Sequence, residues 1–185
     1  MKPKILLFIL LILSLPVFGI TQNEQIKIKS EVEAVCNSFN NPCKVEFINS
    51  IIPQAYATYQ GKIIITSELF NTLNYEEVRA VALHETGHHV LKHYKQTDKF
   101  LKTWDLKQES LIRFRYKNEL EADRFVIEYN KLIGHNEYLN QALLHLVSPE
   151  KLNIKTNTHP SPQYRIEVIN QNIKNNYRNL LKWNE

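Results

Sequence analysis

Two histidines and a glutamate close together in the sequence form the pattern best suited to chemistry. His84, Glu85 and His88 make an H-E-x-x-H motif. On an α-helix, side chains four residues apart lie on the same face, one turn above the other, so both imidazoles can bind one Zn²⁺. The glutamate can then act as a base toward a water molecule at the open zinc position. Because the motif has only three fixed residues, a surface helix with two hydrogen-bonded histidines is the alternative.

The motif requires a helix, which periodicity predicts over residues 75–94, with Asn74 as its N-cap. Apolar residues three and four positions apart form one stripe, and both histidines lie at its border. The stripe consists of Ala80, Leu83, Gly87, Val90, Leu91 and Tyr94. Gly87 has no side chain, so a second helix could approach the motif closely there. Leu91 and Tyr94 also exclude a metzincin, which needs Gly and His at those positions.

A third metal ligand is expected from a long helix over residues 105–133, which Gly134 should end. One face of this helix carries two carboxylates, Glu119 and Asp123, among apolar residues. A buried carboxylate is costly unless it is paired or binds a metal. We therefore predict that Glu119 ligates the metal and that Asp123 accepts the free N–H of a ligand histidine. If the helical phase is shifted by one residue, both carboxylates instead share a solvated face with Glu121.

The other elements are predicted from periodicity and turn residues. Helices are expected over residues 22–39, 68–73 and 137–147 and from Pro162 past Ile169, and strands over 44–49, 55–59 and 62–66. Ser67 should cap the second of these helices, and residues 96–103 and 150–158 should form loops. The fold class is therefore α+β, mostly helical, with a small antiparallel sheet ahead of the H-E-x-x-H helix.

Composition and charge favour one exported globular domain. The chain has 185 residues, of which 43% are hydrophobic, and a formal net charge of +4, too small to favour nucleic-acid binding. Residues 1–19 combine two lysines, an apolar run and Pro16, which is typical of a secretory signal peptide. Residues 20–185 would then form a single domain that is periplasmic or secreted, with no stable membrane insertion. An uncleaved membrane anchor is the alternative.

The chain's two cysteines, Cys36 and Cys43, lie between the first predicted helix and the first strand. In an oxidising compartment they could form a disulfide that joins these two elements. Two unpaired thiols are the alternative. Because neither cysteine is near the histidine motif in sequence, a Cys-ligated zinc site is not expected.

The motifs in combination resemble the HtpX and CAAX-prenyl-protease type of gluzincin metallopeptidase. The H-E-x-x-H motif is followed by E-x-x-A-D from Glu119 to Asp123, as in that family. His159 and Arg165 lie in a segment that resembles the family's late T-H-P-x-x-x-x-R-I sequence. The resemblance covers residues 45–169 and implies a zincin-like fold. With no predicted spanning helix after the signal, the chain is most similar to the small secreted or periplasmic members, such as BepA and LoiP.

The resemblance implies a zinc metalloendopeptidase with one Zn²⁺ per chain. Together with the residue pattern it assigns His84, His88 and Glu119 as ligands and Glu85 as the general base for peptide hydrolysis. It places His159 near the site, either as a second oxyanion stabiliser or as a removable fourth ligand that keeps the enzyme latent. Arg165 would hold that segment in place or lie on the surface. His89 and His93 are expected to be second-layer or solvent-exposed residues.

The expected substrate is an extended polypeptide that adds as a strand to Ala55, Tyr56 and Ala57 through main-chain hydrogen bonds. The family's edge strand often carries Asn-Ala-Phe where this chain has Gln54-Ala55-Tyr56, a departure that bears on substrate contacts. A role in envelope protein quality control is implied by the resemblance alone. The alternatives are a catalytically silent, zinc-stabilised binding or chaperone module and a helical interaction domain without metal. An intact Glu85 favours the enzyme, because a structural zinc site needs no base.

Overall fold

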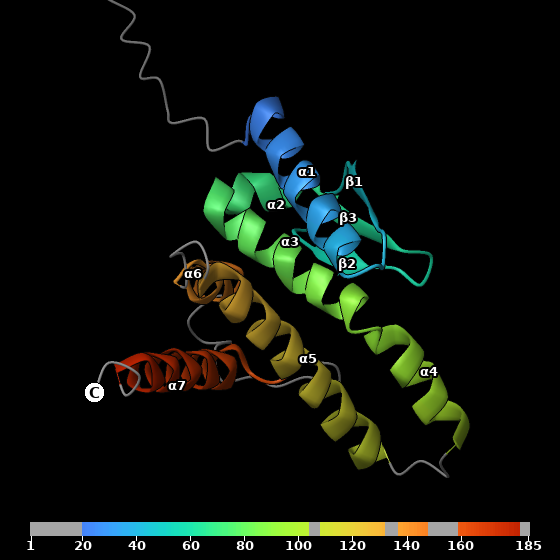
Figure 1. Cartoon of the computed structure of the whole chain (residues 1–185). Coiled ribbons are helices and arrows are strands. Elements are labelled where there is room, and N and C mark those ends of the chain that lie inside the picture. The colour runs from blue at the N-terminus through green and yellow to red at the C-terminus, as the bar shows by residue number, and fades with distance from the viewer. Residues whose placement is uncertain (1–19, 104–107, 132–136, 148–158, 182–185) are drawn as a thin grey trace, which may run out of the picture.

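The structure is a computed structural model that describes residues 20–103, 108–131, 137–147 and 159–181, with only the backbone at 103, 131 and 173–181. The elements, in chain order, are α1 (Gln22–Ser38), β1 (Lys44–Ile48), β2 (Ala55–Ala57), β3 (Lys62–Thr66), α2 (Ser67–Thr72), α3 (Tyr75–Val90), α4 (His93–Thr103), α5 (Gln108–Lys131), α6 (Tyr138–His145) and α7 (Pro162–Leu181). Figure 1 shows a small sheet beside a larger set of helices. The predicted α+β, mostly helical fold class is confirmed.

The sheet has the strand order β1-β3-β2 and is mixed. β2 and β3 pair antiparallel, as the predicted hairpin requires, and the turn between them contains Gly61 with φ +79°. β1 pairs parallel with β3, with Val45 opposite Ile63. The expectation of a wholly antiparallel sheet is therefore wrong. The chain after β1 crosses to the far side of β3 before β2 begins, so β3 returns in the direction of β1.

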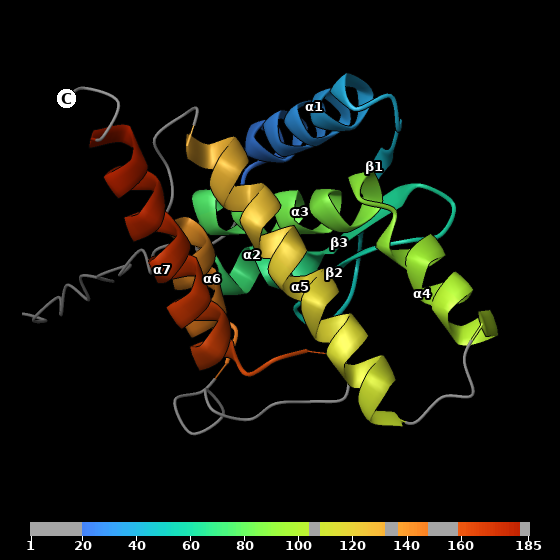
Figure 2. The ribbon, with the colours of Figure 1, turned by 60° about the horizontal axis from the view of Figure 1, so that its bottom comes forward.

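Helix α3 lies at the centre of the molecule, between α1 and α5 in both views (Figures 1 and 2). Val78 and Ala82 pack into a core with α1, the sheet and α2. Ala80 and Leu83 pack into a second core with α5, α6 and α7. Every residue of α3 is at least partly buried. The prediction of one apolar stripe is therefore wrong: a helix between two cores is covered on all sides, so one-sided periodicity does not describe it.

The two ends of α3 differ in how well the sequence indicates them. Asn74 caps the start as predicted, in a capping box. Its side chain accepts from the Glu77 N–H, and the Glu77 side chain accepts from the Asn74 N–H. The helix ends at Val90 rather than residue 94, because Lys92 adopts a left-handed conformation with φ +58°. A separate helix, α4, then begins at His93.

The loop predicted over residues 96–103 is wrong, since these residues belong to α4. The side of α4 toward α5 carries buried His93, then Thr97 and Phe100, whose ring stacks on Phe114 of α5. Two of these three residues are polar, so the face does not register as an apolar stripe.

The first residue of α2 also differs from the prediction. Ser67 does not cap this helix; its N-cap is Thr66, with no side-chain cap bond. The Ser67 hydroxyl instead donates to the Ser50 carbonyl at 3.2 Å and accepts from the Ser50 N–H at 3.1 Å. Ser67 therefore ties the start of α2 to the chain after β1.

Gly87 marks the close approach of α3 and α5, as predicted. A Cβ at this position would lie 3.2 Å from Ala122 Cα and 3.2 Å from Phe125 Cβ. Both atoms belong to α5, the helix that carries the two predicted carboxylates. The missing side chain therefore brings the second metal-binding helix against the first.

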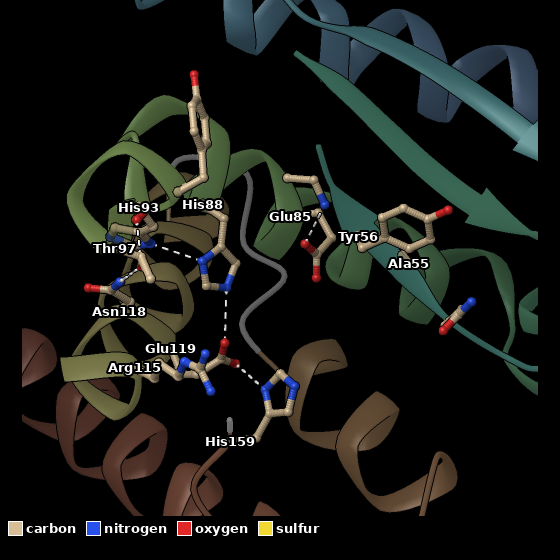
Figure 3. Close-up of a pocket in the computed structure, with 13 residues that line it drawn as sticks. Ala55, Tyr56, Glu85, His88, His93, Thr97, Arg115, Asn118, Glu119 and His159 are labelled. Carbon is tan, nitrogen blue, oxygen red and sulfur yellow. Dashed lines mark hydrogen bonds and ion pairs between the residues drawn. The ribbon is translucent and has the colours of Figure 1, made fainter. Parts of the chain in front are cut away.

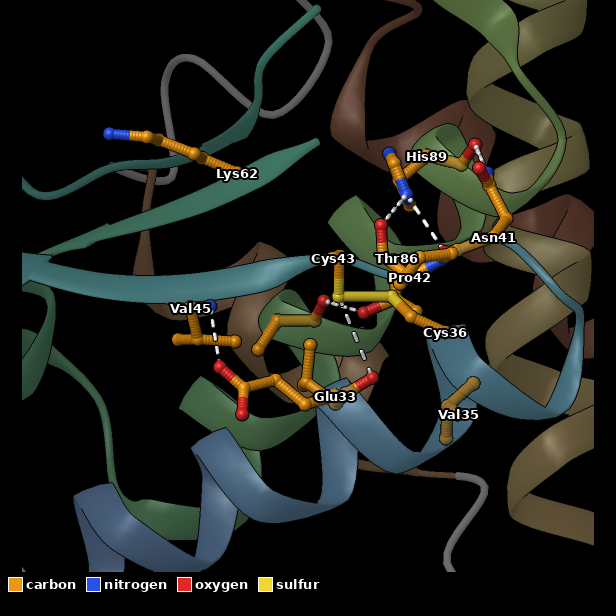
Figure 4. Close-up of a disulfide and its surroundings, with 12 residues drawn as sticks. Glu33, Val35, Cys36, Asn41, Pro42, Cys43, Val45, Lys62, Thr86 and His89 are labelled. Carbon is orange, nitrogen blue, oxygen red and sulfur yellow. Dashed lines mark hydrogen bonds between the residues drawn. A yellow bond between two sulfur atoms is a disulfide. The ribbon is translucent and has the colours of Figure 1, made fainter. Parts of the chain in front are cut away.

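Cys36 and Cys43 form a disulfide that joins α1 to the start of β1, which confirms the predicted pairing (Figure 4). The loop between them packs on the end of α3. His89 Nε2 lies 3.0 Å from the Asn41 carbonyl and 3.2 Å from that of Pro42, and Asn41 donates to the His89 carbonyl at 2.8 Å. His89 is buried, so it is not solvent-exposed.

The remaining helices follow the predictions closely. α6 covers most of the predicted residues 137–147, and α7 begins at Pro162 and continues to Leu181. Predictions for residues 1–19, Gly134 and 150–158 lie outside the described residues. Within the described part of the chain, none of the helices combines the length and apolarity needed to cross a bilayer.

Candidate metal centre

Helices α3 and α5 bring the three predicted ligands together. His84 Nε2 and His88 Nε2 lie 3.1 Å apart. Glu119 Oε2 is 3.4 Å from the first of these nitrogens, and Glu119 Oε1 is 3.3 Å from the second. His84 and Glu119 are buried and His88 is partly buried. Figure 3 shows His88 and Glu119 facing each other, with Glu85 to one side of His88.

The spacing of these atoms fits zinc. A tetrahedral zinc ion with ligand bonds of about 2.0–2.1 Å separates neighbouring ligand atoms by about 3.3 Å. The two imidazole nitrogens are 3.1 Å apart, close to this value. Each of them has one oxygen of the Glu119 carboxylate nearby, Oε1 at 3.3 Å from His88 and Oε2 at 3.4 Å from His84. Two imidazole nitrogens and a carboxylate also form a donor set that suits zinc, whereas magnesium and calcium prefer oxygen ligands. His84, His88 and Glu119 could therefore hold one metal ion.

Asp123 occupies the supporting position predicted for it. Its Oδ1 lies 2.9 Å from His84 Nδ1. Arg165 of α7 pairs with the same carboxylate through two bonds, of 2.9 Å from Nε and 2.6 Å from Nη2. Both side chains are buried, so Arg165 is not a surface residue. Its Nη1 also lies 3.4 Å from Glu119 Oε2, and the guanidinium thereby contacts both carboxylates.

The electrostatics keep both carboxylates ionised. Burial disfavours charge on Asp123, but the charge of Arg165 and the hydrogen bond with His84 lower the pKa of Asp123 to about 2. Burial also disfavours charge on Glu119, but hydrogen bonds with His159, His84 and His88 hold the pKa of Glu119 far below its usual range. Burial and Arg165 disfavour charge on His84, yet its bonds to Asp123 and Glu119 raise its pKa to about 9. Ionised carboxylates are the form that binds a metal.

Glu85 faces the cleft beside the ligands. Its Oε2 accepts the Ala57 N–H at 2.9 Å, so the H-E-x-x-H helix is bonded directly to strand β2. β2 is the edge strand next to β3. Thr58 donates to the Lys62 carbonyl on β3, and in an antiparallel pair the bonding direction alternates along the strand. The main chain of Ala57 therefore points away from the sheet, toward the ligands.

A cleft of about 580 Å³ runs between β2 and helices α4 and α5. Its walls contain all three residues predicted to bind substrate, Ala55, Tyr56 and Ala57. A smaller pocket of about 170 Å³ opens beside it, with apolar walls from α3 and α6 that include Val81 and Leu143. The predicted base Glu85, the candidate ligands His88 and Glu119 and the strand edge thus border one open space (Figure 3), and His84 borders the smaller pocket.

His159 also borders this cleft, next to Glu119 (Figure 3). Its Nδ1 lies 3.0 Å from Glu119 Oε2, and its side chain is 56% exposed. The position is compatible with both predicted roles, because the ring is next to a ligand and open to the cleft. Cys36 and Cys43 are paired with each other in the disulfide that joins α1 to β1.

His93, which was expected to be a second-layer or a solvent-exposed residue, lies in the second layer, against a candidate ligand. It is 3% exposed, and its Nδ1 lies 2.9 Å from Nδ1 of the ligand His88. Burial is the largest cause that lowers the pKa of His93, to about 3, so its ring is neutral at physiological pH. On a continuous helix a residue five positions after His88 would point elsewhere. The break at Lys92, which no sequence pattern indicates, turns His93 back toward the site.

Comparisons with known proteins agree with this arrangement. A family model described as Peptidase family M48 matches residues 22–106, which include the H-E-x-x-H motif and end before α5. A solved structure described as the crystal structure of S. mikatae Ste24p is similar in fold, with a TM-score of 0.51 and 17% sequence identity. The similarity covers 77% of this chain and 49% of that one, so the chain spans about half the length of the Ste24p structure. No curated protein matches the chain.

Proposed function

We propose that this protein is a zinc-dependent metalloendopeptidase that cleaves extended or misfolded polypeptides. The observation that carries the proposal is the convergence of His84, His88 and Glu119 beside Glu85 in a cleft bordered by an edge strand. The match of residues 22–106 to Peptidase family M48 and the Ste24p-like fold support a metallopeptidase.

His84, His88 and Glu119 would hold the zinc ion. When bound, zinc would polarise the scissile carbonyl and lower the pKa of the attacking water. With the metal bound, Asp123 would accept the Nδ1–H of His84 in a hydrogen bond, so that Nε2 would be the nitrogen that offers its lone pair to the metal. The charge of Arg165 keeps Asp123 ionised for this task.

Glu85 is the proton carrier of the reaction. Its carboxylate borders the cleft and is held toward β2 by the Ala57 N–H. From this position it takes a proton from the attacking water and later delivers it to the leaving amine. The leaving nitrogen and the water must both lie near Glu85, so the scissile bond has to cross the cleft between β2 and Glu119.

The edge strand supports an extended peptide as substrate. Ala57 directs main-chain groups toward the cleft, and a peptide can add to this edge as a further strand. Main-chain bonds are made by any sequence, so such binding selects extended segments more than particular side chains. This selectivity suits the removal of misfolded envelope proteins. We also propose that the protein is exported to the periplasm or the exterior.

Metal content and casein cleavage by wild type and Glu85→Gln test this function. We expect wild type to carry about one zinc per chain and to cut casein. Glu85→Gln should keep the zinc and lose activity by about 10²-fold or more, because the base is missing. Glu128→Gln, the same change at an exposed ion pair on α5, is the matched control and should behave as wild type. A wild type without zinc, or an active Glu85→Gln, would overturn the proposal.

His159→Ala separates the two roles of that residue and the main rival function. An oxyanion stabiliser predicts a lower kcat with zinc retained, whereas a latent fourth ligand predicts higher activity. If wild type and His159→Ala both bind zinc and neither cuts casein, the protein is a zinc-stabilised binding or chaperone module instead. The variant is informative because His159 lies next to the candidate ligand Glu119.

A further inference from the structure

We propose that His93 is a positioning residue of the metal centre, which fixes the tautomer and ring orientation of His88 and is itself fixed by Glu121. The proposal rests on the zinc site of the proposed function. It adds to that site a chain of three side chains, from α5 through α4 to α3.

The rings of His93 and His88 are placed for one direct hydrogen bond. Their Nδ1 atoms lie 2.9 Å apart, and the ring planes are nearly perpendicular, at 77°, with centroids 4.9 Å apart. Figure 3 shows this bond on the side of His88 away from Glu119. His93 is 3% exposed, so solvent does not compete for the contact.

The direction of the bond follows from the position of the metal site. His88 Nε2 faces His84 and Glu119, so it is the nitrogen that must offer a lone pair to a metal. A neutral imidazole carries its single proton on the other nitrogen, which is Nδ1. His88 Nδ1–H therefore donates, and His93 Nδ1 accepts.

Glu121 completes the chain. Since His93 Nδ1 is an acceptor, the proton of that neutral ring is on Nε2. Nε2 lies 3.3 Å from Glu121 Oε2, an acceptor with no proton of its own when ionised. The tautomers of both histidines are thus set from one end by a carboxylate, as in the carboxylate–histidine pairs that support many zinc sites.

The two ligand histidines are then supported from the same helix by different means. His84 meets its carboxylate, Asp123, directly at 2.9 Å. His88 reaches Glu121, two residues earlier on α5, through His93. The start of α4 is anchored for this purpose: Thr97 Oγ1 donates to the His93 carbonyl at 2.8 Å and contacts Asn118 of α5.

The zinc affinity of the full chain tests the proposal. It is measured near neutral pH by competition with a coloured chelator. We expect His93→Leu, which keeps an apolar side chain but removes the acceptor, to bind zinc about 10–100-fold more weakly than wild type. His93→Asn should stay within about threefold of wild type, because its amide oxygen can accept from His88 in place of ring Nδ1. Glu121→Ala should show a smaller loss than His93→Leu.

Ile28→Ala serves as the control for general destabilisation, since Ile28 is buried in α1 away from the ligands. Its zinc affinity should match that of wild type although its unfolding temperature falls. Wild-type affinity in His93→Leu would overturn the proposal and leave the peptidase function standing. Equal losses in His93→Leu and His93→Asn would also overturn it, because they would indicate packing rather than an acceptor. Failure of wild type to bind zinc would overturn the proposed function as well.

Discussion

At the scale of single residues, the site depends on buried charges that are mutually satisfied. Asp123 is 1% exposed and contacts both His84 and Arg165. A buried charge without a partner is far more costly than a buried pair. Each of these residues is therefore needed for the fold of the site as well as for its chemistry.

Asp123→Ala should lower the free energy of unfolding by about 3–5 kcal/mol, because it leaves the buried guanidinium of Arg165 without its main partner. Urea unfolding with a chelator present measures this without a contribution from zinc. Asp98→Ala is the control: Asp98 forms an exposed pair with Lys102, and its loss should cost under about 1 kcal/mol. Equal effects of the two variants would show that the buried pair does not stabilise the fold.

At the scale of elements, the distance between α3 and α5 decides whether the ligands meet. Two ligands belong to α3 and the third to α5, and at Gly87 the two helices lie so close that an added Cβ would be 3.2 Å from Ala122 Cα. α4 adds a wall to the cleft and presents His93. The disulfide and His89 hold the far end of α3 against the loop between α1 and β1.

Gly87→Ala should destabilise the protein by about 1–3 kcal/mol through overpacking. The new Cβ would meet the backbone of Ala122 at 3.2 Å, which can yield only if α5 shifts. A gain of about 1 kcal/mol in helix propensity opposes this loss. The unfolding temperature and the zinc affinity of the variant measure the effect. Both should be lower than in wild type, because a shift of α5 also moves Glu119. A variant that is more stable than wild type would contradict the close approach.

At the scale of the whole molecule, the site joins segments that are far apart in sequence. α3 carries two of the candidate ligands and the candidate base, α5 the third candidate ligand, β2 the strand edge and α7 the guanidinium of Arg165. A metal ion bound by α3 and α5 would connect the parts of the molecule on either side of the second core. Zinc should therefore act as a stabiliser of the fold.

Zinc should raise the unfolding temperature of chelator-treated protein. At a free concentration of about 1,000 times Kd, binding to the folded state alone stabilises by about 4 kcal/mol. Calorimetry with zinc, with chelator and with magnesium measures the effect. Magnesium should produce no comparable shift, because two imidazoles and one carboxylate do not suit it. Equal unfolding temperatures with zinc and with chelator would exclude this ligand group as a zinc site.

Residues whose roles depend on local spacing could be predicted from the sequence. The four-residue spacing of His84 and His88 places both on one helix face, and the phase of α5 follows from its apolar residues, which is why Glu119 and Asp123 were found. The hairpin and the cap at Asn74 also depend on neighbouring residues only. In each case the information lies within a few turns of the chain.

Relations between distant segments were decided only by the tertiary structure. The parallel pairing of β1, the bond from Ala57 to Glu85 and the pairing of Arg165 with Asp123 join residues brought together by packing around α3. The choice between the two positions expected for His93 was also decided this way: one left-handed residue, Lys92, ends α3 and redirects the chain toward α5. The amino-acid sequence by itself indicated the candidate ligands and the candidate base, because helix geometry is local. The supports of those ligands come from long-range packing, which no short pattern encodes.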